Sequence, residues 1–153
     1  MIDKNIILNI GKNAKLASRE LAKLSSRKKN SILQSMAEAL RKDRELIKKE
    51  NDKDLENGNK NGLTSSLLDR LELNDNRIDS MINGLHDVIA LNDPVGEEIS
   101  GWDRPNGLHI RKVRSPIGVI GIIFESRPNV TCDAAALCFK TSNAVILRGG
   151  KEA

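Results

Sequence analysis

Apolar residues recur every three or four positions through most of the first 93 residues, and this is the period of helices that bury one face. One stripe predicts a helix within residues 4–24. A second stripe, from Leu33 to Ile47, predicts another helix with Ser25 or Ser26 as its N-cap. The segment 57–62, which reads Asn-Gly-Asn-Lys-Asn-Gly, predicts a break.

Two further helices are expected before the pattern changes near residue 93. Thr64 is a candidate cap for a short helix through Leu71, and Asn74 is a candidate cap for a stripe that continues to Ile89. Asp93-Pro94 ends this last helix, because proline cannot continue a helix and restricts the residue before it. Core packing accounts for all of these stripes.

After residue 93 the apolar pattern becomes that of strands. Residues 97–113 predict a β-hairpin that turns at Pro105-Asn106-Gly107. The uninterrupted apolar run 119–124 predicts a strand covered on both faces, and 144–147 predicts a second buried strand after an alanine-rich helix at 131–141. A strand, a helix and a strand of these lengths form one βαβ unit, in which the strands are parallel.

Together these elements predict an α/β fold with a helical layer over residues 1–93, a hairpin over 94–115 and a βαβ unit over 116–153. The hairpin carries Trp102 and has no obvious cover within the chain, and a two-stranded hairpin is marginal by itself. We therefore expect it to pair with another segment or to hold a homo-oligomer together.

Composition narrows the class of protein. Charged residues make up 30% of the chain, and neither a membrane-spanning run nor a secretion signal is visible, which indicates a soluble, cytoplasmic protein. Cys132 and Cys138 are expected to be reduced thiols, and no metal site is expected because their spacing does not fit one. The net charge of +4 leaves nucleic-acid binding as a minor alternative, since acidic residues are interleaved with the basic ones and aromatic residues are scarce.

Ligands in open parallel sheets bind beyond the carboxyl ends of the strands. That rule selects two polar loops, residues 125–129 after the first strand and 148–151 after the second. Gly149 and Gly150 permit close approach of the backbone to a ligand, and Arg148 and Lys151 suit a ribose 2′-phosphate better than free hydroxyls. The G-x-G-x-x-G fingerprint is missing, so an ordinary pyrophosphate loop is not expected.

The run from Ser115 to Gly150 resembles γ-glutamyl phosphate reductase, a family also called glutamate-5-semialdehyde dehydrogenase, within the aldehyde dehydrogenase superfamily. The segment 125–131, Glu-Ser-Arg-Pro-Asn-Val-Thr, carries the resemblance together with Asp-Ala-Ala-Ala-Leu at 133–137. Upstream segments at 67–71, 93–96 and 102–108 agree with it. The resemblance covers nearly the whole chain, as the N-terminal portion of the family's enzymes.

This resemblance implies an oxidoreductase of proline (and so amino-acid) biosynthesis with the aldehyde dehydrogenase fold, which uses NADP(H) to reduce L-glutamyl 5-phosphate to L-glutamate 5-semialdehyde and phosphate. The family's nucleophilic cysteine lies downstream of Gly150, and Cys132 and Cys138 do not match it, so both are expected to be inert and partly buried. The catalytic domain is then absent from this chain, which is expected to be inactive alone. Residues 1–93 become the helical segment of the cofactor-binding domain, and 116–153 the start of its NADP-binding sheet.

The resemblance also implies roles for individual residues. Asn129 matches the amide that donates to the developing oxyanion, and it is the one catalytic residue expected here. The residues implied to bind the cofactor are Glu125, Ser126, Arg127, Pro128, Arg148, Gly149, Gly150 and Lys151. The first four match the loop along the nicotinamide-side ribose and the substrate pocket, and Arg148 and Lys151 flank the adenosine ribose.

Two other functions stay open at this point. A non-catalytic chain whose hairpin and helices act in assembly would show no specific dinucleotide binding. A basic nucleic-acid-binding module would bind DNA or RNA with steep salt dependence.

Overall fold

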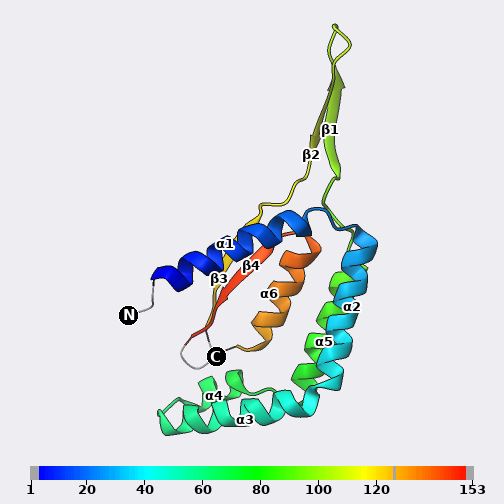
Figure 1. Cartoon of the computed structure of the whole chain (residues 1–153). Helices are drawn as coiled ribbons and strands as arrows, with labels where there is room; N and C mark the ends of the chain where they lie inside the picture. The colour runs from blue at the N-terminus through cyan, green and yellow to red at the C-terminus, as the bar shows by residue number, and fades with distance from the viewer. Residues whose placement is uncertain (1–3, 126, 151–153) are drawn as a thin grey trace.

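The helical stripes fold largely as the sequence predicts. In the computed structural model, which describes residues 4–125 and 127–150, the N-terminal part forms α1 (Lys4–Leu21), α2 (Ser26–Lys42), α3 (Arg44–Lys60), α4 (Ser65–Leu71) and α5 (Asp75–Ala90) (Figure 1). Side-chain oxygens of Ser25, Thr64 and Asn74 each accept a hydrogen bond from the backbone N–H three residues on. These bonds fix the starts of α2, α4 and α5, and they confirm the predicted caps.

The sequence pattern predicted a single helix for the stripe from Leu33 to Ile47, and this prediction is wrong. The chain turns at Asp43, which ends α2 and begins α3, and α3 then leads away from α2 along the bottom of the molecule in Figure 1. Leu40 and Ile47 nevertheless both pack against the same core, one from each helix. The apolar spacing survives the turn, so the pattern alone could not reveal it.

Two helix ends also differ from the prediction. The break expected over 57–62 begins only at Asn61, because Gly58 is buried within α3, where a Cβ would lie 2.9 Å from the side chain of Leu63. Tertiary packing therefore keeps this Gly- and Asn-rich turn helical. Helix α5 ends at Ala90 rather than at Asp93-Pro94. The extended residues that follow place Asp93 beside the buried side chain of Lys29.

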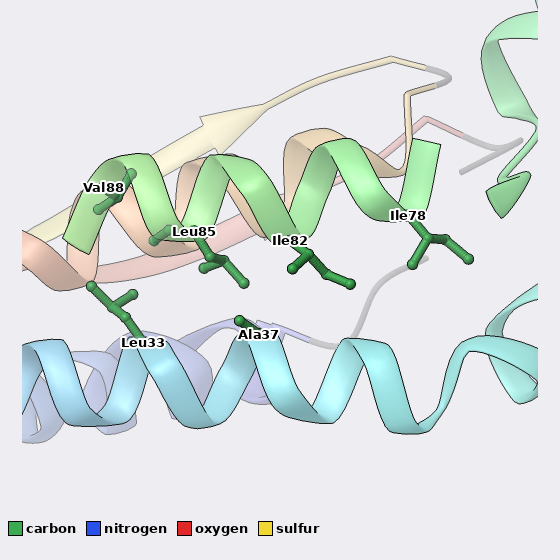
Figure 2. Packing of buried hydrophobic residues seen from close by; sticks show 7 residues of the cluster. Leu33, Ala37, Ile78, Ile82, Leu85 and Val88 are labelled. Carbon is green, nitrogen blue, oxygen red and sulfur yellow. The ribbon is translucent and has the colours of Figure 1, made fainter. Parts of the chain in front are cut away.

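Most of the core lies between α2 and α5, which run side by side (Figure 1). The buried apolar cluster consists of Leu33 and Ala37 from α2, Ile78, Ile82, Leu85 and Val88 from α5, and Ala136 from the helix that follows β3. Figure 2 shows the α2 side chains pointing at the α5 stripe across the space between the two helices. The predicted stripes of α2 and α5 thus supply core residues, as expected. The stripe of α1 does not, because Ile6 and Ile10 are 54% and 45% exposed and the buried residue of that helix is Ser18.

A buried polar cluster fastens the C-terminal elements to this helical pair. Lys29 of α2 is 1% exposed, and its Nζ contacts the Asp93 carboxylate and donates to the Lys140 carbonyl at 3.1 Å and to Ser142 Oγ at 3.0 Å. Lys140 Nζ in turn donates to Asn30 Oδ1 at 2.7 Å and to a carbonyl at the end of α5. Both buried ammonium groups of the cluster therefore find acceptors, as low-polarity surroundings require.

The predicted hairpin is confirmed as β1 (Glu98–Asp103) paired antiparallel with β2 (His109–Val113). It projects away from the rest of the chain at the top of Figure 1. Trp102 is 47% exposed and all six residues of β1 are exposed, so the described part of the chain supplies no cover for it.

The βαβ unit is also confirmed. Strands β3 (Val119–Ile123) and β4 (Ala144–Arg148) pair in parallel, joined by α6 (Asn129–Lys140), and α1 and α6 both pack against β4. The prediction that the first strand is covered on both faces is wrong within this chain, because Ile123 is 86% exposed and Gly121 is also exposed. The sheet has only two strands in the described residues, so both of its edges are open.

We predict that Lys29→Met lowers the free energy of unfolding by about 3–5 kcal/mol, because it leaves the buried Asp93 carboxylate without its cation. Urea unfolding followed by circular dichroism measures the change. Lys53→Met is the matched control: Lys53 pairs with Glu50, but both side chains are more than half exposed, so stability should hardly change. Equal effects of the two substitutions would contradict a structural role for the buried pair.

Candidate functional site

The two predicted ligand loops lie at the same edge of the small sheet. Ile123 and Arg148 are register partners at the carboxyl ends of β3 and β4, and the N–H of Phe124 donates to the Arg148 carbonyl at 3.0 Å. The loops that follow therefore start side by side, as the parallel pairing requires. Ser126 and Lys151, which were assigned to these loops, lie outside the described residues.

The first loop leads directly into α6, and Asn129 is the first residue of that helix. Its Nδ2 donates to Asp133 Oδ2 at 3.1 Å, one turn further along the same helix. Asn129 and Pro128 are half-buried, whereas Glu125 and Arg127 are exposed. The bond to Asp133 fixes the orientation of the amide and uses one of its two N–H groups.

The second loop presents a guanidinium group. The Arg148 side chain is exposed and donates to the carbonyl of Gly149, and Gly149 and Gly150 are half-buried. Within the described residues Arg148 forms no ion pair with a carboxylate. The positive charge at this strand end is therefore available to an anionic ligand.

A pocket of about 310 Å³ opens between the start of α6 and the neighbouring helices. Arg127, Asn129 and Asp133 line it from the α6 side. Arg77, Ser80 and Met81 line it from α5, and Asp69 and Arg70 complete it from α4. The pocket thus brings together two predicted site residues, Arg127 and Asn129, while Glu125, Pro128 and the Arg148 loop lie outside its lining.

Sequence reasoning missed the contribution of α4 and α5 to this pocket. Arg77, Ser80 and Met81 follow the i, i+3, i+4 spacing that puts residues on one helix face, but their polar members lay outside the apolar stripe that was interpreted as core. Residues 67–71, which carry Asp69 and Arg70, were assigned to a short helix and to the resemblance to the reductase family, but not to a site. A charged face beside an apolar stripe was the available signal.

Neither cysteine has the surroundings of a nucleophile. Burial, with a smaller contribution from the neighbouring Asp133 carboxylate, raises the pKa of Cys132 to about 11. Burial also raises the pKa of the Cys138 thiol. Both groups stay protonated near neutral pH, where a reactive cysteine must be a thiolate.

The described residues bring no group of three or more potential metal-ligating side chains together. None of the helices in residues 4–125 and 127–150 is long and apolar enough to cross a membrane.

Comparison with known proteins finds close similarity along nearly the whole chain. The γ-glutamyl phosphate reductase of Clostridium novyi (strain NT) is 54% identical over 150 residues, which are 98% of this chain and 36% of that protein. The crystal structure of the γ-glutamyl phosphate reductase of Thermotoga maritima matches with a TM-score of 0.92 at 46% identity, over 95% of this chain and 35% of that one. The chain therefore spans about a third of the length of the relatives it matches.

A more distant match reports on the fold alone. The structure of a putative aldehyde dehydrogenase from Bacillus subtilis is 19% identical and matches with a TM-score of 0.61, over 91% of this chain and 28% of that one. No family model matches the chain. The arrangement of helices, hairpin and βαβ unit is thus the one found in part of an aldehyde dehydrogenase, as the sequence resemblance implied.

Proposed function

We propose that this chain is the N-terminal part of a γ-glutamyl phosphate reductase that works in the cytoplasm and uses NADPH to reduce L-glutamyl 5-phosphate to L-glutamate 5-semialdehyde and phosphate in proline biosynthesis. The observation that carries the proposal is the similarity to reductases of that name over 98% of the chain. The position of Asn129 supports it, because this amide lines a pocket together with guanidinium and carboxylate groups, in surroundings suited to a substrate that carries charges of both signs.

In this proposal Asn129 stabilises the oxyanion that develops at the acyl carbon. The hydrogen bond to Asp133 holds the amide in place and leaves its second N–H free to donate. The attacking thiol belongs to a domain outside these residues, since neither Cys132 nor Cys138 has the lowered pKa of a nucleophile. The chain alone is therefore inactive.

The residues at the sheet edge fit NADPH. Arg148 offers an exposed guanidinium without a carboxylate partner in the described residues, which suits a 2′-phosphate, and Lys151 adds a second charge. Gly149 and Gly150 let the backbone approach the adenosine ribose. Glu125, Ser126, Arg127 and Pro128 belong to the loop that runs along the nicotinamide-side ribose and the substrate pocket. When bound, NADPH supplies the hydride for the reduction.

The three segments have separate tasks in this proposal. Residues 1–93 form the helical part of the cofactor-binding domain, and 116–153 begin its NADP-binding sheet. The hairpin segment 94–115 joins subunits, because β1 is exposed along its whole length and its Trp102 lacks a cover within the described chain.

We predict that the 153-residue chain gives no turnover with glutamate 5-semialdehyde, phosphate and NADP⁺, followed through NADPH absorbance. In a complete reductase that carries these residues, Asn129→Ala should lower kcat roughly a hundredfold to a thousandfold, because one oxyanion donor is lost. Cys132→Ser and Cys138→Ser are the controls and should leave turnover unchanged. Turnover by the chain alone that disappears with either cysteine would contradict the proposal.

We predict that the complete reductase binds NADPH more tightly than NADH and that Arg148 is a main cause. Arg148→Ala should weaken NADPH binding by roughly tenfold to a hundredfold, since a charge-assisted hydrogen bond to the 2′-phosphate is lost. Binding of NADH, which lacks that phosphate, should hardly change. Dissociation constants from fluorescence titration decide the matter: equal losses for both cofactors, or no loss for either, would remove Arg148 from this role.

We predict that deletion of the hairpin, residues 97–113, lowers the mass of the particle in solution. Multi-angle light scattering of the wild type and the deletion variant measures it, and circular dichroism checks that the helices persist. A wild-type chain that is folded and strictly monomeric would rule the hairpin out as an assembly element in this chain.

A further inference from the structure

The pocket beside Asn129 carries charges of both signs. Arg70, Arg77 and Arg127 supply three guanidinium groups, and Asp69 and Asp133 supply two carboxylates. These residues come from α4, α5 and the start of α6, so three separate elements bring the charges to one cavity. A ligand that matches this wall must itself present groups of both signs.

The three arginines are not equally available. Arg77 contacts the Asp69 carbonyl, donates to the Glu72 carbonyl at 2.9 Å and pairs with the Asp69 carboxylate at 3.0 Å. Its guanidinium therefore braces the end of α4 rather than facing a ligand. The exposed side chains of Arg70 and Arg127 have no hydrogen-bond or ion-pair partner in the described part of the chain, and both reach the pocket.

The carboxylates differ in the same way. Asp69 is neutralised by Arg77, whereas Asp133 has no cationic partner among residues 4–125 and 127–150. Asp133 Oδ2 accepts a hydrogen bond from Asn129, and Oδ1 lies close to the backbone of Gly84, 3.6 Å from where a Cβ would stand. The pocket thus holds one uncompensated carboxylate beside two uncompensated guanidinium groups.

We propose that this pocket recognises the α-amino-acid end of the substrate, with Arg127 and Arg70 binding the α-carboxylate and Asp133 binding the α-ammonium group. The assignment rests on the proposed function, which puts the acyl carbon beside Asn129. The other end of a five-carbon amino acid then lies within the same cavity. Arg77 is a positioning residue, because it holds the α4 end from which Arg70 projects.

The carboxylate of Asp133 separates this assignment from a phosphate site. A phosphate group would be repelled by an unpaired carboxylate in the wall, whereas an ammonium group is attracted by it. The amide of Asn129 donates a hydrogen bond to Asp133 but carries no charge, so it does not neutralise the Asp133 carboxylate. The mixed wall therefore fits a ligand that carries an ammonium group beside its carboxylate better than an anion that lacks one.

The test is a ¹⁵N NMR titration of the chain with three probes: L-glutamate, glutarate and inorganic phosphate. L-Glutamate stands in for the substrate because it has the same α-amino-acid end, and glutarate lacks only the ammonium group. We expect saturable shifts around Arg127 and Asp133 with L-glutamate, and at least about tenfold weaker binding of glutarate, since a charge-assisted hydrogen bond is missing.

Two variants and a control sharpen the test. Arg127→Ala should weaken the binding of L-glutamate by about tenfold or more. Asp133→Asn should make the affinities for L-glutamate and glutarate alike. Asp87→Asn is the matched control, because Asp87 is an exposed carboxylate of α5 that does not line the pocket. It should leave all three affinities unchanged.

Three results would overturn the assignment. The first is the absence of a saturable shift with L-glutamate. The second is binding of glutarate or of phosphate as tight as that of L-glutamate, and the third is an Asp133→Asn variant that still prefers L-glutamate to glutarate. The titration uses neither NADPH nor turnover, so a negative result in it would be separate from a failure of the proposed function. Binding of L-glutamate by this chain, together with no reductase activity in a complete protein that carries these residues, would refute only the function. A working reductase whose pocket ignores the ammonium group would refute only this assignment.

Discussion

The buried ammonium group of Lys29 is the interaction on which the arrangement of the remaining elements depends. It contacts Asp93 after α5, the last residue of α6 and Ser142 in the turn before β4, and so joins three segments to α2. Burial works to raise the pKa of Asp93, but hydrogen bonds from Lys29 and Ser26 hold it below its usual value. The stability that the pair contributes is therefore present above the ordinary carboxylate range and is lost as the pH falls through the lowered pKa.

This polar cluster positions the candidate site from a distance. It fixes the C-terminal end of α6, while the site lies at the other end of the same helix, at Asn129 and Asp133. The apolar contact between Ala136 and the α2–α5 pair holds the middle of α6. These contacts place the first turn of α6 beside α5, where Asn129 and Asp133 line the pocket.

Local signals in the sequence predicted the element types well, because caps, turn residues and apolar periods act within a few residues of one another. The turn at Asp43 and the helical state of Gly58 were not predictable in this way, since each depends on packing between segments. The same holds for the site. The loop residues Arg127 and Asn129 were found from their place after a strand, whereas Arg70 and Arg77 belong to the pocket only because α4 and α5 fold back beside α6.

The contact between α1 and β4 has a consequence for how the chain is made. Helix α1 comprises residues 4–21 and packs against a strand that begins at Ala144, so this helix is synthesised well before its partner strand has appeared (Figure 1). At ordinary rates of translation this interval is on the order of ten seconds. During that time α1 is without its contact to β4 and is open to chaperones and to other nascent chains.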